Sequence, residues 1–311
     1  ARSDVLQPRE ALPEPLRQRA RGAPCLLAFR LLLARTWREL MRDRVAIGIK
    51  TFMQLLFTIM FGTVYYQMDM SQKSLQNRTG ILFFAAMNQA FASIIGCSQM
   101  IPRQLKVVQR ERASKLYGML PYYLANMLTQ LPIETLPGAL FGVIVYVMTA
   151  LRPGREHMLV YVGLLSLENL VGIGLGMVIS ASVSSVEMAP QVAPAFVILF
   201  VMFSGFLLNQ DSIPQIFAPL KHISFVRYAF QGLAVNELRD NTGFSCKEKI
   251  FGPQCIQGND WLRQLGFEGV SIWRCTMALL AEFAIFNVLA FAILVSKKPA
   301  FLKIRPRQEQ P

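Results

Sequence analysis

Six stretches of apolar residues, each long enough to cross a lipid bilayer, divide the chain. They cover residues 45–66, 80–101, 119–151, 158–183, 188–208 and 271–295. A membrane-crossing helix needs about 20 mostly apolar residues, so the pattern predicts an all-α integral membrane protein with six transmembrane helices. The third stretch is too long for one straight span. Its three prolines, Pro121, Pro132 and Pro137, predict that it is divided or kinked, with an interfacial first part.

Residues 25–44 precede the first span and predict an amphipathic helix. At 100° per residue, one side carries Leu26, Phe29, Leu33, Trp37 and Leu40, and the opposite side carries Arg35, Arg38 and Arg42. A Trp-bearing apolar face opposite an arginine face suits a membrane interface; the alternative is a surface helix of a soluble domain. Residues 1–24, rich in Pro and Arg, lack the apolar core of a signal peptide and are interpreted as a cytoplasmic linker.

Basic residues are shared unevenly between the segments that connect the spans. The 311 residues include 32 Lys and Arg against 19 Asp and Glu, yet only 16% are charged and 53% are hydrophobic. This composition excludes a disordered chain and argues against a nucleic-acid partner. Twenty basic residues fall in 1–44, 102–116 and 297–311, and ten in 67–78, 152–157 and 209–270. The positive-inside rule therefore predicts that both termini are cytoplasmic and that 209–270 is a long external loop.

Two features of the predicted external side suggest covalent modification. Asn77 begins an Asn-x-Thr sequon in the first external loop, which makes it a candidate glycosylation site. Cys246 and Cys255 lie in the long external loop, where an oxidising environment permits a disulfide. Two free thiols or an intermolecular bond are the alternatives for this pair.

The sequence contains no recognisable catalytic or metal-binding motif. It has two histidines far apart, no H-E-x-x-H, C-x-x-C or G-x-S-x-G pattern and no phosphate-binding loop. We therefore expect no catalytic residues, no metal site and no cofactor held by these residues. Gly172 and Gly176 favour close helix packing over a dinucleotide loop, because they lie inside an apolar span. Polar residues within spans mark functional or packing positions: Asn88, Gln89, Glu134, Glu168 and Asn169.

Several short segments, in a fixed order on the six-span frame, resemble one family. They are residues 88–91, 110–112 with Tyr117, 131–137, 203–209, 227–230 and 236–237. From about residue 25 to 303 the chain resembles the transmembrane half of the G subfamily of ABC transporters, the White-type half-transporters. The domain would thus cover 25–303, with 304–311 as a cytoplasmic tail. The initial Ala and the Pro/Arg-rich start favour truncation of a longer chain over a separate ATPase subunit.

The resemblance assigns roles to particular segments. It implies that 25–44 is a connecting helix along the inner leaflet, and that 209–270 is an external lid with short helices dipping toward the membrane. Loop 102–116 would couple to a nucleotide-binding domain through Arg103, Arg110, Glu111 and Arg112; simple positive-inside anchoring is an alternative, and both can hold.

The resemblance also implies a substrate path on a dimer axis. Phe84, Asn88 and Phe91 share one helical face, with Phe91 as the clamp. Ile198 and Val201 would form the facing wall, and Phe206 and Leu207 a hydrophobic valve, where many relatives carry Leu-Leu. Ordinary core or lipid-facing packing is the alternative for all of these apolar residues.

The implied function is the permease domain of an ATP-driven exporter at the plasma membrane. It would move an apolar or amphipathic small molecule or lipid by alternating access, as a homo- or heterodimer surrounded by membrane lipid. ATP and Mg would bind a nucleotide-binding domain outside these residues, so the chain alone is not expected to be an enzyme. An ATP-independent carrier or channel is the first alternative, and an intramembrane enzyme the second.

Overall fold

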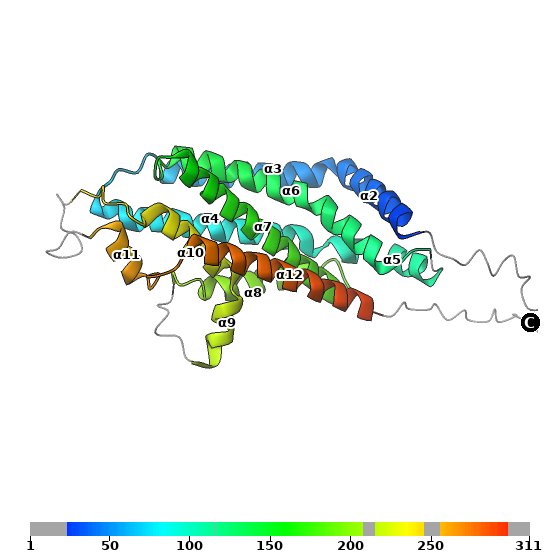
Figure 1. Cartoon of the computed structure of the whole chain (residues 1–311). Helices are drawn as coiled ribbons and strands as arrows, with labels where there is room; N and C mark the ends of the chain where they lie inside the picture. The colour runs from blue at the N-terminus through cyan, green and yellow to red at the C-terminus, as the bar shows by residue number, and fades with distance from the viewer. Residues whose placement is uncertain (1–23, 115, 208–214, 246–255, 298–311) are drawn as a thin grey trace, which may run out of the picture.

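The structure, a computed structural model, describes residues 24–114, 116–207, 215–245 and 256–297. Within these ranges the secondary structure is helical, and the long helices run side by side along one axis (Figure 1). The predicted pair Cys246 and Cys255 lies outside the described residues, as does most of the predicted linker.

Five helices of the described part are long and apolar enough to cross a membrane. They are α3 (Arg44–Val64), α4 (Gln72–Ser98), α6 (Met119–Met148), α7 (Arg155–Ser182) and α12 (Ile272–Ser296). The predicted fifth span corresponds to α8 (Ala189–Met202), which has only 14 residues. At 1.5 Å per residue it is about 21 Å long, shorter than the ~30 Å hydrocarbon core. The all-α membrane architecture is thus confirmed, with one short helix among the six.

The prediction that prolines divide the third span is wrong. α6 is one continuous helix of 30 residues, with Pro132 and Pro137 inside it. Pro121 lies in its first turn, where a missing N–H costs nothing. Prolines are tolerated inside membrane helices when neighbouring helices and small local adjustments satisfy the freed backbone groups. Here α6 is flanked by α2, α3 and α7.

The second span begins eight residues earlier than predicted. Ser71 caps α4 by accepting a hydrogen bond from the backbone N–H of Ser74. Asn77 therefore lies in the second turn of a helix, with its side chain exposed, and not in a loop. Its glycosylation stays a prediction.

Two further helices lie at the end of the bundle opposite α11 (Gly258–Gln264) (Figure 1). The predicted amphipathic helix is α2 (Cys25–Arg42), which packs along the first half of α6 through a buried stripe of Ala28, Leu32 and Thr36. Residues 102–116, predicted as a loop, instead form most of α5 (Met100–Ala113), which follows α4 after Gln99. Its apolar positions Ile101 and Val108 are buried against the bundle, which explains the helix.

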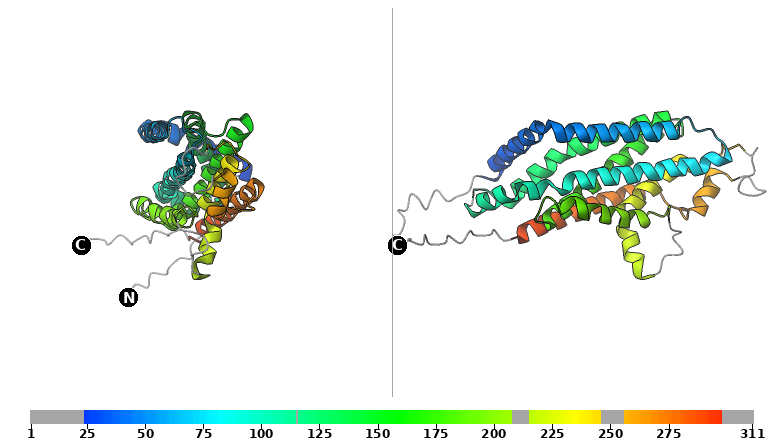
Figure 2. Two further views of the ribbon diagram at one scale, coloured as in Figure 1. Left: turned by 90° about the vertical axis from the view of Figure 1, so that its left-hand side faces the viewer. Right: turned by 180° about the vertical axis from the view of Figure 1, so that it is seen from behind.

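Between α8 and α12, residues 215–245 and 256–271 contain four short elements. They are η2 (Gln215–Phe217), α9 (Ala218–Ile223), α10 (Phe225–Leu238) and α11 (Gly258–Gln264). Twelve of the 14 residues of α10 are buried, because this helix packs among α4, α7 and α12. In contrast, α9 points away from the bundle (Figures 1 and 2).

The tight contact between α4 and α7 confirms the predicted packing role of Gly172 and Gly176. A Cβ added to Gly172 would lie 1.9 Å from Ser93 Oγ, and one added to Gly176 would lie 2.9 Å from the carbonyl oxygen of Ile94. Both distances are too short for any larger residue, so the two glycines set the separation of the helices.

Candidate functional site

One stripe of α4 remains partly uncovered along the length of the bundle. Phe84, Met87, Phe91 and Ile95 are half-buried, while the positions between them are mostly buried. The predicted trio thus shares one side of α4, with Asn88 9% exposed between the two phenylalanines. The side-chain N–H₂ of Asn88 has no hydrogen-bond partner among the described residues. Phe84 also stacks on Phe61 of α3, with ring centroids 6.0 Å apart.

The two predicted wall residues on α8 have different environments. Val201 is 7% exposed and belongs to the same hydrophobic core as α4, whereas Ile198 is 53% exposed. Met202, four residues later on the same side of the helix, is also exposed. The structure therefore places Val201 in the core and leaves Ile198 on an open apolar face.

The two predicted valve residues also diverge. The Phe206 ring stacks on Phe83 with centroids 4.3 Å apart and meets Phe230 edge to face at 5.7 Å. Leu207, in contrast, is 56% exposed. Phe83 and Phe230 were not predicted as site residues, although 227–230 is one of the segments that carry the resemblance. Phe206 is thus fixed in an aromatic cluster between α4 and α10.

The four predicted coupling residues on α5 divide into two groups. Glu111 accepts hydrogen bonds from Arg35 Nη1 at 2.7 Å and from Tyr117 Oη at 2.5 Å. Arg112 donates to the backbone oxygens of Lys297 and, at 3.0 Å, of Val295, at the C-terminal end of α12. These two residues therefore join α5 to α2 and α12.

The remaining two, Arg103 and Arg110, are exposed. Arg103 donates to Gln99 Oε1 at 2.6 Å and lies 3.8 Å from Asp43. The Arg110 side chain makes no hydrogen bond or ion pair with another residue in the described ranges.

Burial, and next the hydrogen bond to Glu111, raise the pKa of Tyr117, so this phenol stays protonated and keeps donating its hydrogen bond to Glu111.

An ion pair between two spans was not predicted. Lys50 of α3 contacts Glu134 of α6, whose side chain is 3% exposed. The carboxylate lies directly over Gly96 of α4, where an added Cβ would be 2.4 Å from Glu134 Oε1. A Lys and a Glu that each lie within a span are expected to pair in a membrane protein. That signal was present in the sequence, because Lys50 lies in the first predicted span and Glu134 in the third.

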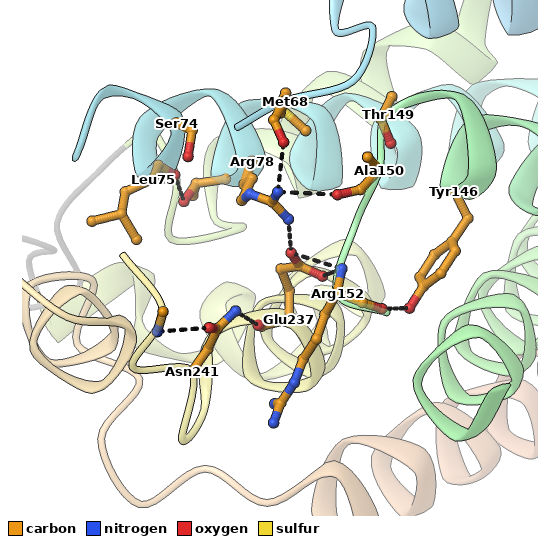
Figure 3. Close-up of polar contacts among 12 residues, drawn as sticks. Met68, Ser74, Leu75, Arg78, Tyr146, Thr149, Ala150, Arg152, Glu237 and Asn241 are labelled. Carbon is orange, nitrogen blue, oxygen red and sulfur yellow. Dashed lines mark hydrogen bonds and ion pairs between the residues drawn. The ribbon is translucent and has the colours of Figure 1, made fainter. Parts of the chain in front are cut away.

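A second ion pair, with both side chains buried, lies where α4, α10 and the turn between α6 and α7 meet (Figure 3). Arg78 of α4 pairs with Glu237 of α10, and both side chains are 1% exposed. Arg78 Nη2 also donates to the carbonyl oxygens of Met68 at 2.9 Å and Ala150 at 3.0 Å. Glu237 Oε2 accepts from the backbone N–H of Arg152 at 2.9 Å. The pair thus connects α4, the turn between α6 and α7, and α10.

The other polar residues within the spans have fewer partners. Asn169 donates to Gln89 Oε1 at 3.0 Å, which links α7 to α4. Both carboxylate oxygens of Glu168 and of Glu282 are buried without a hydrogen-bond partner among the described residues. Within the same ranges, no group of three or more His, Cys, Asp or Glu side chains is arranged to hold a metal ion.

Comparison with known proteins gives a consistent result. Residues 27–238 match the family model described as ABC-2 type transporter. The chain is 32% identical over 278 residues to ABC transporter G family member 7 of Arabidopsis thaliana, covering 89% of this chain and 38% of the relative. It is 29% identical over 288 residues to protein white of Drosophila melanogaster, covering 91% of this chain and 42% of that protein. The chain thus spans about two fifths of the length of these relatives.

Proposed function

Because the chain belongs to the ABC-2 type transporter family, with relatives in its G subfamily over most of its length, we propose that it forms the permease domain of an ATP-driven exporter. Its cargo is an apolar or amphipathic small molecule or lipid, and transport proceeds by alternating access. ATP and Mg bind a nucleotide-binding domain, in the same chain or in a partner. The membrane is the plasma membrane, with both termini cytoplasmic.

The observation that carries this proposal is the partly uncovered stripe of α4. An amide that is buried without a hydrogen bond costs about 1–3 kcal/mol. The N–H₂ group of Asn88 is such a group, and it lies between two half-buried phenylalanines, Phe84 and Phe91. Binding sites for small apolar ligands combine apolar walls with a few polar groups that fix orientation. A ligand oxygen would satisfy Asn88 while its apolar body lies against the two rings.

A single copy leaves the path open on one side. Ile198 and Met202 of α8 are exposed apolar side chains on one side of the helix, and α8 packs beside α4. A second half-transporter, identical or related, would cover this face and enclose the stripe of α4. We assign Leu207, exposed beside the fixed ring of Phe206, to the movable part of the valve.

The position of α5 supports a route for coupling to ATP hydrolysis. α5 follows α4 directly, holds α2 through Glu111 and holds the end of α12 through Arg112. A push on α5 would therefore reach three helices together. Arg103 and Arg110, which are exposed on α5, would contact the nucleotide-binding domain.

Transport by the complete transporter in membrane vesicles tests the proposal. Phe91→Ala and Asn88→Leu are each expected to lower ATP-dependent uptake of fluorescent sterol and fluorescent short-chain phospholipid probes at unchanged surface delivery. Phe52→Ala is the matched control, because Phe52 is 60% exposed on α3. The path assignment is refuted if both path variants transport a probe as fast as the unaltered protein transports it. Uptake that persists without ATP would instead support a carrier or channel.

A further inference from the structure

An apolar groove runs between α2 and the first half of α6. One hollow of about 420 Å³ lies between Leu33, Trp37 and Leu128, and Arg30 also lines it. A second hollow, of about 320 Å³, lies between Leu26, Phe29 and Leu124. We call these two hollows together the α2–α6 groove. Neither helix contributes a residue to the transport path proposed above, so the groove is a separate feature.

The walls of the groove extend into exposed apolar surface. On α6, Leu120, Leu124 and Leu128 follow each other at intervals of four residues and are 47%, 42% and 46% exposed. On α2, Leu26 and Trp37 are 72% and 41% exposed. Apolar surface of this extent is unfavourable in water. It is suited to the acyl chains of a bilayer, which the neighbouring helices are built to cross.

The charge beside the groove selects the kind of lipid. Arg30 lines the larger hollow, is exposed, and forms no ion pair or hydrogen bond within the described part of the chain, whereas Arg38 and Arg42 lie on the other side of α2. The fourth arginine of α2, Arg35, is already paired with Glu111. Guanidinium groups bind phosphate through two parallel hydrogen bonds, and tryptophan prefers the level of the lipid headgroups. Trp37 lies in the same hollow as Arg30.

We propose that the α2–α6 groove is a binding site for an anionic glycerophospholipid of the cytoplasmic leaflet. The acyl chains occupy the two hollows, and Arg30, which lines the larger one, binds the phosphate. The leaflet follows from the proposed orientation of the chain. Since Arg35 of the same helix is bound to Glu111 of α5, a lipid seated here stiffens the contact through which α5 would transmit its movement.

Quenching of tryptophan fluorescence by brominated lipids tests this site directly. The complete protein is reconstituted in phosphatidylcholine vesicles that contain brominated phosphatidylserine or, separately, brominated phosphatidylcholine at the same mole fraction. The difference between the unaltered protein and Trp37→Phe gives the signal from Trp37. One basic residue near a membrane surface contributes roughly fivefold to binding of an anionic lipid. We therefore expect Trp37 to be quenched at several-fold lower mole fraction by the phosphatidylserine.

Variants distinguish binding of an anionic lipid in the groove from its general attraction to a basic surface. Arg30→Gln is expected to remove the preference, whereas Arg38→Gln, on the side of α2 away from the groove, and Arg44→Gln, an exposed arginine outside the groove, are expected to keep it. Leu128→Phe, which adds bulk to the larger hollow without adding a second tryptophan, is expected to weaken quenching by both lipids. Equal quenching of Trp37 by the two lipids, or a preference that survives in Arg30→Gln, overturns the proposal. Because the measurement is of binding, its outcome is independent of whether the protein transports any probe.

Discussion

Removing the guanidinium of Arg78 is expected to be among the most destabilising single changes in the domain. In Arg78→Met, Glu237 keeps only the backbone N–H of Arg152 as a hydrogen-bond donor, and the carbonyl oxygens of Met68 and Ala150 each lose theirs. With both side chains 1% exposed, water cannot replace what is lost. Because these groups come from α4, α10 and the connections before α4 and after α6, the loss affects the packing of several elements at once.

The size of the effect follows from the burial of the pair. Breaking a buried ion pair by removing one partner costs about 3–5 kcal/mol, because the other charge is left uncompensated. For a chain of this size, a loss of 1 kcal/mol lowers the unfolding midpoint by roughly 2 °C. Arg78→Met should therefore lower it by roughly 6–10 °C. The double variant Arg78→Met with Glu237→Met removes both charges and should recover part of that loss.

The measurement is thermal unfolding of the purified protein, followed by tryptophan fluorescence in one detergent for all variants. Lys73→Met is the matched control, since Lys73 is exposed on the same helix five residues earlier. It should shift the midpoint by less than about 1 °C, as surface substitutions usually do. The reasoning is refuted if Arg78→Met behaves like Lys73→Met. It is also refuted if the double variant loses as much as the two single variants added together.

Three further changes test other contacts. Lys50→Met should destabilise more than Glu134→Gln in the same assay, because Glu134 is the more deeply buried partner and Lys50 can still reach a polar surface; equal effects would contradict this. Gly176→Ala should lower the free energy of unfolding by about 1–3 kcal/mol through overpacking. Gly163→Ala should not lower it, because the space around Gly163 is open. Equal unfolding midpoints for the two variants would argue against close contact of α4 and α7. Arg112→Ala should speed hydrogen exchange in the last turn of α12, which it caps, and unchanged exchange would show that this contact is dispensable.

The spans could be predicted because length and apolarity are properties of the chain alone. The start of α4 could not, since its first two turns contain the polar residues Gln72 and Arg78, which resemble a loop. Gln72 is 2% exposed and exchanges two hydrogen bonds with the backbone of Ile256, 184 positions away. The helix extends outward because distant backbone satisfies its polar groups, and a local pattern carries no information about such partners.

The candidate path, too, could be predicted from the sequence only in part. Phe84, Asn88 and Phe91 share a face because helical periodicity fixes their relative directions. Which side of α8 faces α4 depends on the rotation of α8 about its own axis. Nearly every residue of α8 is apolar, so hydropathy gives no orientation, and Ile198 and Val201 could not be distinguished before the structure was known.

The distribution of ionic contacts indicates how α4 can move. Near its start, Arg78 is paired with Glu237; near its end, the Lys50–Glu134 pair lies against it; and α5, which follows, is tied to α2 through Glu111. Between these fixed points lies the stripe that is only partly covered. A helix held at both ends and close-packed on α7 along one side cannot shift along its axis without breaking several buried polar contacts. Tilting or turning of α4 about its contact with α7 breaks the fewest buried contacts and moves the uncovered side most. The residues on that side are therefore the ones that an alternating-access cycle would expose and occlude.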